Sequence, residues 1–581
     1  RNSTGVGPTD TVNPLHIVNI NCNDVAITVL PNAPIDTSTG LPVPTIAVAT
    51  DGGTNVINDD GTVTQGYQTI ATENVDLHPA GFMTDGISGA TNDSFSFYDI
   101  NKTDRLVSYG HRVDTQVINT FLNEGTGECL FEGKSNKIAI AQSQGLLRIA
   151  EEIDIERASD AVSLGLHNRT ASSYNTGWMV ADIKGAFMSD TDTTNVTGSE
   201  LVTNGTFDSD ISSWTYTGSG SATHGSGQVT VTGAVGDRIY QDITGLTVGE
   251  TYVLSGQIVS GTNGQISMYQ NAHASSGAFI VGSGNISPQR INLVFTAPTT
   301  TVNLRLVRVS STVVYDNISV RKAELDRSAN GQPYQVGGVN YSIGQNALAV
   351  FGTITKSTVA TGAELVAYNG FTTSNYLFQP HNTDLQFGTG DYSVMLWYKG
   401  TSGSTGSREV FAHLKGASAG FWLLAKEYTN KFVFDSVTNP DTYTEDVWYH
   451  VAGVRGSGTA RLYVNGELVG SAATNDNITD TSVGLFVGQS PDNNDWRTRG
   501  SLALLRISAS APSPEQIKKI YNDEKCLYHE NAKCTLYGTS DAVTALAHDD
   551  SNNTLHVGTS AGRSEFQGLN RINNTTTAVT T

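Results

Sequence analysis

The side chains with the clearest capacity for chemistry are carboxylates, and several come in adjacent pairs. Asp59-Asp60 and Asp549-Asp550 both lie in turn-like sequence, where solvation is the ordinary role of such a pair. The chain contains no HExxH pattern and no P-loop, so two common catalytic arrangements are absent. Glycosidases take their two catalytic carboxylates from separate strands, and a single sequence does not reveal which distant carboxylates lie together in the fold. We predict a protein that is not an enzyme, with glycan cleavage left as an alternative.

A repeated twelve-residue phrase predicts the elements that would position any site. Its copies occupy residues 46–57, 138–149 and 555–566, with a looser copy at 178–189. Each copy reads as a short apolar strand, a turn with glycine and a second strand, which predicts a β-hairpin. The first two copies start about 90 residues apart, or two periods of the roughly 40 to 50 residues of a propeller blade. We predict the first blades of a β-propeller in residues 1–192.

The repeat is interrupted by an insertion of roughly 350 residues, after which residues 524–581 read as the closing blade. With 581 residues, 60 glycines and only 15% charged residues, the chain should form several all-β domains. The clearest helix begins at Ser513, with Pro514 in its first turn. The start at Arg1, without methionine, suggests a processed or partial product.

Net charge and cysteine content limit the possible partners. The formal net charge of −21 argues against nucleic acid, because phosphate binding requires clustered Lys and Arg. The sequence has no stretch of about eighteen apolar residues, so it predicts no membrane-spanning helix. Of the four cysteines, Cys526 and Cys534 are close enough in sequence to form a disulfide, while Cys22 and Cys129 fall in the predicted propeller strands. The alternative is that all four are reduced, buried thiols.

Residues 198–323 form the first inserted domain. It opens with Leu201-Val-Thr-Asn-Gly-Thr-Phe207 and Trp214, and it closes with Asp316-Asn-Ile-Ser-Val320. Between these ends the sequence alternates as strands do in 228–232, 239–244, 251–259, 265–269, 291–296 and 303–309. The two ends resemble those of jelly-roll carbohydrate-binding modules, so this resemblance implies a jelly roll.

The resemblance also implies a structural calcium ion and a glycan site. The opening and closing segments of that family meet at calcium, so Asp208 and Asp316 would be its carboxylate ligands, with Asn204 or backbone carbonyls completing the oxygen shell. The alternative is that these residues cap their own turns. A glycan site requires flat aromatic faces, and we expect Trp214 to be core. The candidates for sugar contact, each with sheet packing as its alternative, are Tyr240, Tyr252, Tyr269 and His273.

Residues 324–365 read as an extended linker, and residues 366–523 form the second inserted domain. Its phrases are Trp448-Tyr-His-Val-Ala-Gly-Val454, Leu462-Tyr-Val-Asn-Gly-Glu-Leu-Val469 and Gly500-Ser-Leu502, followed by the predicted helix. This order resembles laminin-G-like, concanavalin-type jelly-roll domains. The family usually has an acidic pair where this chain has Ala503-Leu504, which suggests packing against a neighbour.

The same resemblance implies ligand sites at loop edges or on the concave face. The candidates for glycan contact are Trp422, Tyr428, Trp496 and Arg497, with core packing as the alternative for Trp422. Calcium could bind in the loops Asn475–Asn477 or Asp492–Asp495, and solvated turns are the alternative.

An interrupted propeller with lectin-like inserts resembles appendage proteins of tailed bacteriophages, such as tail fibres and spikes. The resemblance implies an extracellular virion protein that binds cell-surface glycan, contacts other virion proteins and forms homo-oligomers, trimers above all. A purely architectural virion protein, with its β-sandwiches as spacers, and a secreted bacterial glycan-binding or glycan-cleaving protein remain alternatives.

Overall fold

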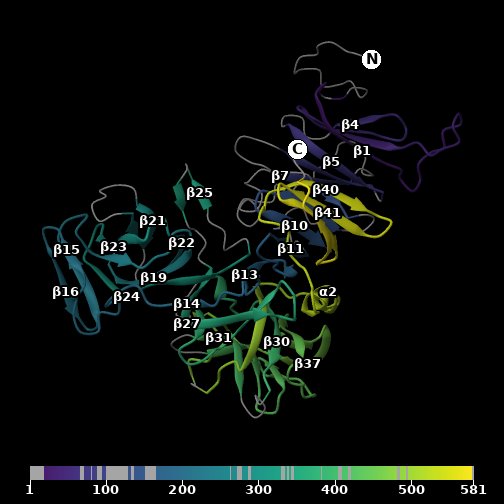
Figure 1. Ribbon diagram of the computed structural model, residues 1–581. Coiled ribbons are helices and arrows are strands. Elements are labelled where there is room, and N and C mark those ends of the chain that lie inside the picture. The colour runs from purple at the N-terminus through teal and green to yellow at the C-terminus, as the bar shows by residue number, and fades with distance from the viewer. Residues whose placement is uncertain are drawn as a thin grey trace. The chain divides into compact units, whose positions relative to one another are not determined.

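The computed structural model divides the chain into two units (Figure 1). The split unit comprises Arg1–Ala181 and Ala532–Thr581, and the inserted unit comprises Asp182–Asn531. The structure describes residues 17, 19–65, 71–79, 81–87, 94–99, 129–132, 137–150, 165–261, 263–270, 278–284, 289–328, 334–336, 339–341, 346–380, 383–402, 408–415, 420–479, 484–492 and 495–578.

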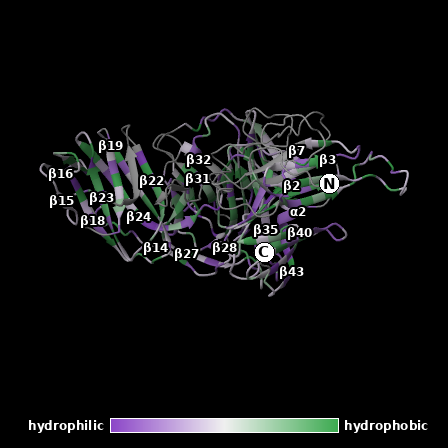
Figure 2. Ribbon diagram, turned by 90° about the horizontal axis from the view of Figure 1, so that it is seen from above, coloured by the Kyte–Doolittle hydropathy of each residue, from purple (hydrophilic) through white to green (hydrophobic). Residues whose placement is uncertain are grey.

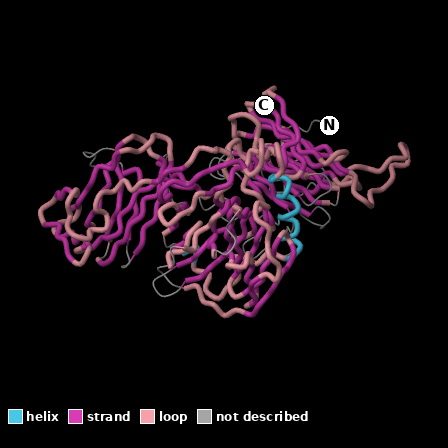
Figure 3. The backbone as a smooth tube through the Cα atoms, turned by 60° about the horizontal axis from the view of Figure 1, so that its bottom comes forward, coloured by secondary structure: helices cyan, strands magenta, loops and turns pink. Residues whose placement is uncertain are grey.

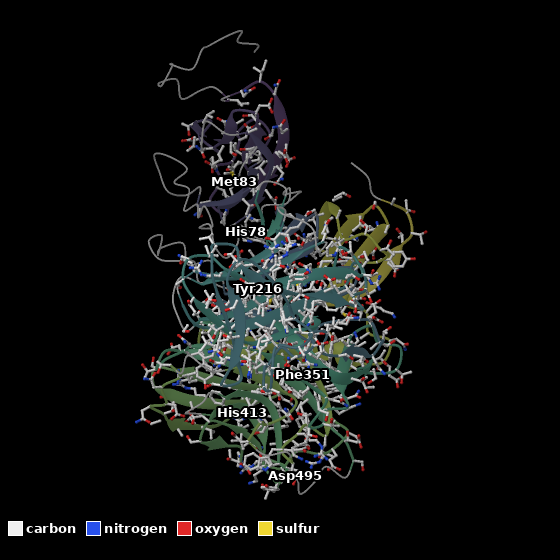
Figure 4. The ribbon with its side chains drawn as sticks, turned by 90° about the vertical axis from the view of Figure 1, so that its left-hand side faces the viewer. His78, Met83, Tyr216, Phe351, His413 and Asp495 are labelled. Carbon is white, nitrogen blue, oxygen red and sulfur yellow. The ribbon has the colours of Figure 1, made fainter. Side chains whose placement is uncertain are left out.

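The split unit is built from small antiparallel sheets. One sheet has the order β1-β2-β3-β4, and another has the order β5-β6-β7. Their strands are β1 (Cys22–Thr28), β2 (Thr45–Thr50), β3 (Gly53–Ile57), β4 (Val63–Gln65), β5 (Thr72–His78), β6 (Phe82–Ile87) and β7 (Ser94–Asp99). Ala47, Val56, Leu77 and Met83 pack together in the core of these sheets. His78 and Met83 are labelled in Figure 4.

Two further sheets complete the described part of the split unit. They have the orders β12-β11-β10-β9-β8 and β40-β41-β42-β43. Their strands are β8 (Cys129–Phe131), β9 (Lys137–Gln142), β10 (Gly145–Ala150), β11 (Leu166–Thr170), β12 (Met179–Val180), β40 (Val543–Asp549), β41 (Thr554–Thr559), β42 (Gly562–Gln567) and β43 (Asn570–Thr575). A common core joins them, in which Ala139 and Leu146 pack with Leu555 and Phe566.

Three of the four predicted hairpins are confirmed. Residues 46–57, 138–149 and 555–566 form β2–β3, β9–β10 and β41–β42, and the end residues of each phrase face each other. The prediction for 178–189 is wrong. There β12 pairs with β11, whereas β13 (Ile183–Phe187) pairs with β39 (Gly500–Ser508) of the inserted unit. The apolar side chains that suggested a hairpin therefore serve two different sheets.

One face of the sheet β1-β2-β3-β4 carries an apolar row. Ile27 faces Ile46, Ile46 faces Ile57, and Ile57 faces Val63, so the row crosses all four strands. Ile27 is 64% exposed, and the other three are partly exposed. The opposite face, which carries Ala47 and Val56, is the buried one. The sheet thus has an aliphatic surface on both sides.

The first jelly roll of the inserted unit consists of two antiparallel sheets. The first is β15 (Thr215–Thr217), β18 (Arg238–Thr244), β23 (Thr301–Arg308), β20 (Gly264–Tyr269) and β21 (Ala278–Gly284); the second is β16 (Ser221–Gly225), β17 (Gln228–Thr232), β24 (Val313–Leu325), β19 (Thr251–Ser260) and β22 (Gln289–Thr296). Their facing side chains form one core. Hydrophobic and hydrophilic residues alternate along these strands (Figure 2), as a half-buried sheet requires. The predicted strands are confirmed.

The second jelly roll comprises residues 347–528 and the strand β13, and it also has two sheets. The first contains β37 (Glu467–Ala473), β36 (Thr459–Val464), β35 (Trp448–Gly456), β30 (Tyr392–Gly400), β39 and β13, with β28 (Val366–Asn369) bridging to β39; the second contains β34 (Val437–Thr438), β33 (Phe432–Phe434), β32 (Gly420–Lys426), β31 (Glu409–Lys415), β38 (Gly484–Val487), β29 (Tyr376–Gln379) and β27 (Ala347–Thr358). Both sheets enclose a large aromatic and aliphatic core. Asn465 and Gly466 both have positive φ, as the predicted type I′ turn requires.

The helix α2 (Pro514–Glu524) packs beside these strands (Figure 3). Ser513 caps it as predicted: the Ser513 hydroxyl accepts from Gln516 N, and the Gln516 side chain accepts from Ser513 N. The thiol of Cys526 donates to the Asp523 carbonyl (3.1 Å) and is not in a disulfide. The predicted Cys526–Cys534 disulfide is therefore absent. Of the described thiols, Cys534 is buried as expected, whereas Cys526 is partly buried and Cys22 is exposed.

The strand β27 joins the two jelly rolls. It lies within 324–365, the segment expected as a linker, together with β25 (Tyr334–Val336) and β26 (Val339–Tyr341). β24 leaves the first jelly roll and pairs with β27 through Ala323–Ala349 and Leu325–Ala347. Val253 and Val294 of the first jelly roll pack against Ala347 and Ala349. A shared sheet and a small core therefore hold the two folds together.

The apolar pair Ala503-Leu504 lies inside this assembly of strands. Both side chains are fully buried, and Leu504 N donates to Met188 O (2.8 Å) beside β13. Ala503 and Leu504, which stand where the resembling family usually has an acidic pair, therefore pack within the same chain. Their apolar character gives no reason to expect a neighbouring subunit there.

Candidate functional site

The first candidate site is the outer surface of the sheet β15-β18-β23-β20-β21. We call it the tyrosine face and define it by Tyr240, Asp242, Tyr269, Asn303 and Arg305. Tyr240 faces Arg305 across β18 and β23, and Asn303 lies between Asp242 and Tyr269. Because alternate residues of a strand share a face, the inner positions Ile239, Leu304 and Leu306 fill the core and these five residues point outward.

A chain of polar contacts fixes the tyrosine face. Asn303 Nδ2 donates to Asp242 Oδ1 (2.8 Å), and Arg305 Nε donates to Asn303 Oδ1 (2.6 Å). The Arg305 guanidinium carbon lies 3.7 Å from the centroid of the Tyr269 ring, which is within the range of a cation–π contact. Burial, and then the like charge of Arg238, lowers the pKa of Arg305 from its ordinary value.

The arrangement suits recognition of a polar, ring-shaped ligand. Tyr240 and Tyr269 are partly exposed and Asp242 is exposed, so aromatic surface and a carboxylate are available together. Asn303 and Arg305 are almost fully buried and support them from below. Ligand sites commonly combine apolar and aromatic lining with a few fixed polar groups. Asp242 is the only carboxylate among these five residues.

Of the three predicted tyrosines, Tyr240 and Tyr269 lie on the tyrosine face, and Tyr252 does not. Tyr252 is 5% exposed, stacks on Phe295 (5.7 Å between ring centroids) and accepts from Thr247 N, so it belongs to the core. His273 lies outside the described residues. Trp214 is core, as predicted.

Sequence reasoning missed Asp242, Asn303 and Arg305. The run Thr301-Val-Asn-Leu-Arg-Leu-Val-Arg308 alternates polar and apolar residues, which was a usable signal for an outward polar face.

A second aromatic cluster lies on the second jelly roll. Trp496 Nε1 donates to the Tyr428 hydroxyl (3.2 Å), and the Arg408 guanidinium lies 4.8 Å from the Trp496 ring centroid. Arg408 also forms a two-pronged ion pair with Glu427. The structure therefore joins the predicted Tyr428 and Trp496 through Arg408, which the sequence did not single out.

The remaining candidates of this domain make other contacts. Arg497 Nη1 lies 3.9 Å from Oδ1 of the exposed Asp495. Trp422 lies in β32 and faces His413 of β31, and its side chain is outside the description. His413 and Asp495 are labelled in Figure 4.

The expected calcium ligands Asp208 and Asp316 are close enough to interact. Burial raises the pKa of Asp316 above its ordinary value, and the negative charge of Asp208 adds to this effect. Two carboxylates that repel each other fit a hard cation such as Ca²⁺. Asn204 uses its Nδ2 to hold the turn at Asp210 Oδ1 (2.9 Å). The opening and closing segments do meet, since Ile318 N donates to Gly205 O and Leu201 N to Val320 O.

The two loops expected as calcium alternatives show contacts of their own. Burial, followed by the charge of Asp435, raises the pKa of Asp476. Asp492 Oδ2 lies 3.6 Å from His413 Nε2. Within the described part of the chain, no group of three or more His, Cys, Asp or Glu side chains is arranged to hold a metal ion. Calcium stays a prediction for all three places.

A serine motif near the C-terminal end of the sequence has a structural explanation. Gly558-Thr-Ser-Ala-Gly562 has the GxSxG spacing of a nucleophile elbow, which requires a strand, a sharp turn and a helix. Here Ser560 lies in the hairpin turn between the strands β41 and β42. Thr559 Oγ1 donates to Gly562 O and accepts from Ala561 N. This motif is therefore a hairpin turn.

Part of the chain is similar to a known family. Residues 371–518 match the model of the concanavalin A-like lectin/glucanases superfamily, in agreement with the fold of the second jelly roll. No curated protein matches the chain.

Similar solved structures include a CBM4 structure (20% identity, TM-score 0.19, 21% of this chain and 98% of that one) and a heptameric SAP-like pentraxin from Limulus polyphemus (14%, 0.20, 23% and 71%). A Trypanosoma rangeli sialidase has 9% identity and a TM-score of 0.24, over 82% of this chain and 96% of that one. With TM-scores this low, these likenesses assign no function.

The described residues contain no helix with the length and apolar character needed to cross a bilayer.

Proposed function

We propose that the protein binds glycan through its inserted unit and does not catalyse a reaction. The tyrosine face carries this proposal, because it combines partly exposed aromatic rings with a fixed carboxylate, amide and guanidinium. Sugar rings have an apolar C–H face for the rings and hydroxyls for the polar groups. The Tyr428–Trp496 cluster offers a second contact of the same chemistry on a lectin-like fold.

The biological setting is an extension of this proposal. We place the protein in a bacteriophage virion, outside the cell, as an appendage in which the split unit is part of a β-propeller that mounts the inserted unit. A single weak site of about millimolar Kd contributes roughly 4 kcal/mol. Several copies in a homo-oligomer, a trimer above all, would raise the avidity by about 10² to 10⁴. Structural calcium at Asp208 and Asp316 belongs to the same proposal.

The test is a glycan array probed with the full chain and with Tyr269→Ala. Binding by the full chain that Tyr269→Ala weakens at least tenfold supports the proposal. Release of reducing sugar from a bound glycan would contradict the non-enzymatic part. Binding unchanged by both Tyr269→Ala and Tyr240→Ala would contradict the placement of the site.

A purely architectural role is the second candidate, and the apolar row Ile27-Ile46-Ile57-Val63 favours it. Exposed aliphatic surface on a sheet is typical of a contact with another protein surface. In that case the full chain would form oligomers through the row and would bind no glycan on the array.

A further inference from the structure

A groove of about 490 Å³ lies where β24 passes from the first jelly roll to the second. Its size is within the roughly 300 to 1,000 Å³ of ligand pockets, which favour junctions between domains. The groove belongs to the second sheet of the first jelly roll and to β27 and β29, so it is separate from the tyrosine face on the first sheet. We propose that this groove is an additional binding site for a neutral oligosaccharide; the proposal rests on the glycan-binding function above.

The two walls of the groove are held in place by the backbone. β24 pairs with β19 through Leu254–Val320 and Ser255–Ser319, and then with β27 through Ala323–Ala349. The opening segment is fixed against the same strand, since Gly205 approaches so closely that a Cβ there would lie 2.0 Å from Ile318 O. A preformed groove avoids much of the ordering cost of binding.

One wall is apolar and aromatic. It is lined by Ala349, Phe351, Phe378 and Pro380. Phe351 stacks on Tyr376, with 4.5 Å between ring centroids and a 10° interplanar angle, and Figure 4 labels Phe351 among the side chains. The Phe378 ring centroid lies 4.5 Å from that of Phe486. These contacts restrain the rings. Because Tyr376 and the Arg321 guanidinium both lie against Phe351, the apolar surface for the C–H face of a sugar comes from Ala349, Phe378 and Pro380.

The facing wall is polar. It is lined by Ser255 and Gln257 from β19, Arg290 from β22, and Asn317 and Ser319 from β24. Ser255 and Gln257 are partly exposed, while Arg290 and Asn317 are exposed. Their hydroxyl, amide and guanidinium groups match the hydrogen-bonding capacity of sugar hydroxyls. An apolar wall opposite a polar wall is the arrangement that an amphipathic pyranose ring fits.

One ion pair and one further arginine are the charged groups of the described lining, so the walls meet a ligand mainly through neutral polar and apolar side chains. Glu200 accepts from Ser319 Oγ (2.7 Å) and Val320 N (2.9 Å) and lies 3.2 Å from Arg321 Nε. The Arg321 guanidinium also covers Phe351 at 3.9 Å. This ion pair neutralises itself, which leaves Arg290 as the other charged lining residue. Among the described residues that line the groove, Glu200 is the only carboxylate, whereas a glycosidase uses two.

The test compares variants of the full chain on an array of neutral oligosaccharides, with uronic-acid and sialylated glycans as a second arm. Gln257→Ala removes hydrogen bonds from the groove, and Gln257→Trp fills it without removing the aromatic wall. Lys322→Ala, on the same strand β24 but outside the lining, is the matched control. We expect both Gln257 variants to lose at least tenfold in affinity for a set of neutral glycans, with Lys322→Ala unchanged and all melting temperatures preserved.

Other outcomes separate the groove from the tyrosine face. In one outcome, Tyr269→Ala abolishes glycan binding and both Gln257 variants preserve it. This outcome would overturn the groove as a binding site and would leave the proposed function standing. Binding that only the Gln257 variants affect would support the groove and overturn the tyrosine face as the main site. Preferential loss of the acidic glycans in the Gln257 variants would overturn the neutral ligand. No binding of any glycan would overturn both.

Discussion

The guanidinium of Arg305 covers the ring of Tyr269 at 3.7 Å while its Nε donates to Asn303. A buried cation thus fixes an aromatic ring that is partly exposed on the tyrosine face. Lysine lacks the planar fork that makes both contacts at once. The geometry of this pair therefore makes separate predictions for binding and for stability.

We expect Arg305→Lys to weaken glycan binding about tenfold, which corresponds to about 1.4 kcal/mol, because Tyr269 loses its fixed orientation. Tyr252→Phe is the matched control, since it removes only a buried hydroxyl that accepts from Thr247 N. It should cost about 1 kcal/mol of stability with binding preserved. Titration calorimetry and thermal unfolding check both variants. Equal loss of binding in the two variants would contradict the prediction.

Stability of the inserted unit should depend on pH through Glu324 and Asp326. Burial, with Asp190 adding its charge, raises the pKa of Glu324 from 4.5 to about 7, although Lys356 and Arg327 oppose this. Burial likewise raises the pKa of Asp326 from 3.8 to about 7. Between about pH 4 and 7 the folded chain therefore binds protons that the unfolded chain has released. The free energy of unfolding should fall as the pH rises through this window.

Urea unfolding between pH 4.5 and 8 measures this dependence. The double variant Glu324→Gln, Asp326→Asn should flatten the profile, because neither amide titrates. Glu515→Gln, at an exposed position of α2, should leave the slope as it is. A wild-type profile that rises over the same window would contradict the sign.

Glu524 is expected to be essential for the second jelly roll. It accepts from Trp397 Nε1 (2.8 Å) and forms a fully buried ion pair with Arg506. Removing one partner of a buried pair leaves an uncompensated charge and costs about 3 to 5 kcal/mol. We expect Glu524→Ala to lose this amount in urea unfolding followed by tryptophan fluorescence. Glu515→Ala, on the exposed side of the same helix, should change stability by less than about 0.5 kcal/mol.

Calcium should stabilise the first jelly roll through Asp208 and Asp316. With free Ca²⁺ at about 100 times its Kd, binding to the folded state adds about 2.7 kcal/mol. We expect EDTA to lower the melting temperature of the wild type and to leave that of Asp208→Asn, Asp316→Asn unchanged. Asp210→Asn is the control within the same turn. Equal melting temperatures of the wild type with EDTA and with excess calcium would remove calcium from the proposal.

The apolar row of the split unit should mediate self-association with a second copy. Two copies of a chain with a formal net charge of −21 should repel each other. The apolar row carries no charge, so two copies can meet there without that repulsion. Ile27→Asp should shift the mass measured by light scattering toward the monomer. Val248→Asp is the control, because Val248 is 58% exposed in the other unit. A monomeric wild type, or an oligomer unchanged by Ile27→Asp, would contradict the prediction.

Local sequence patterns predicted much of the fold because strands and turns have short-range signals. The three hairpins, the strands of the first jelly roll, the cap at Ser513 and the turn at Asn465 all followed from spacing and residue type. The error at 178–189 arose because an apolar strand does not specify its partner, and β39 is more than 300 residues away in sequence. Arg305 and Arg408 were missed for the same reason, since their contacts depend on tertiary pairing.

The continuous strand β24 has a mechanical consequence. It belongs to both jelly rolls, because Val313–Val320 pairs within the first and Ala323–Leu325 pairs with β27 of the second. A pulling force along this strand would load many hydrogen bonds at once in shear, whereas a flexible tether would stretch before it transmitted any force. A protein that grips a surface through the inserted unit would therefore pass tension from one fold to the next with little slack.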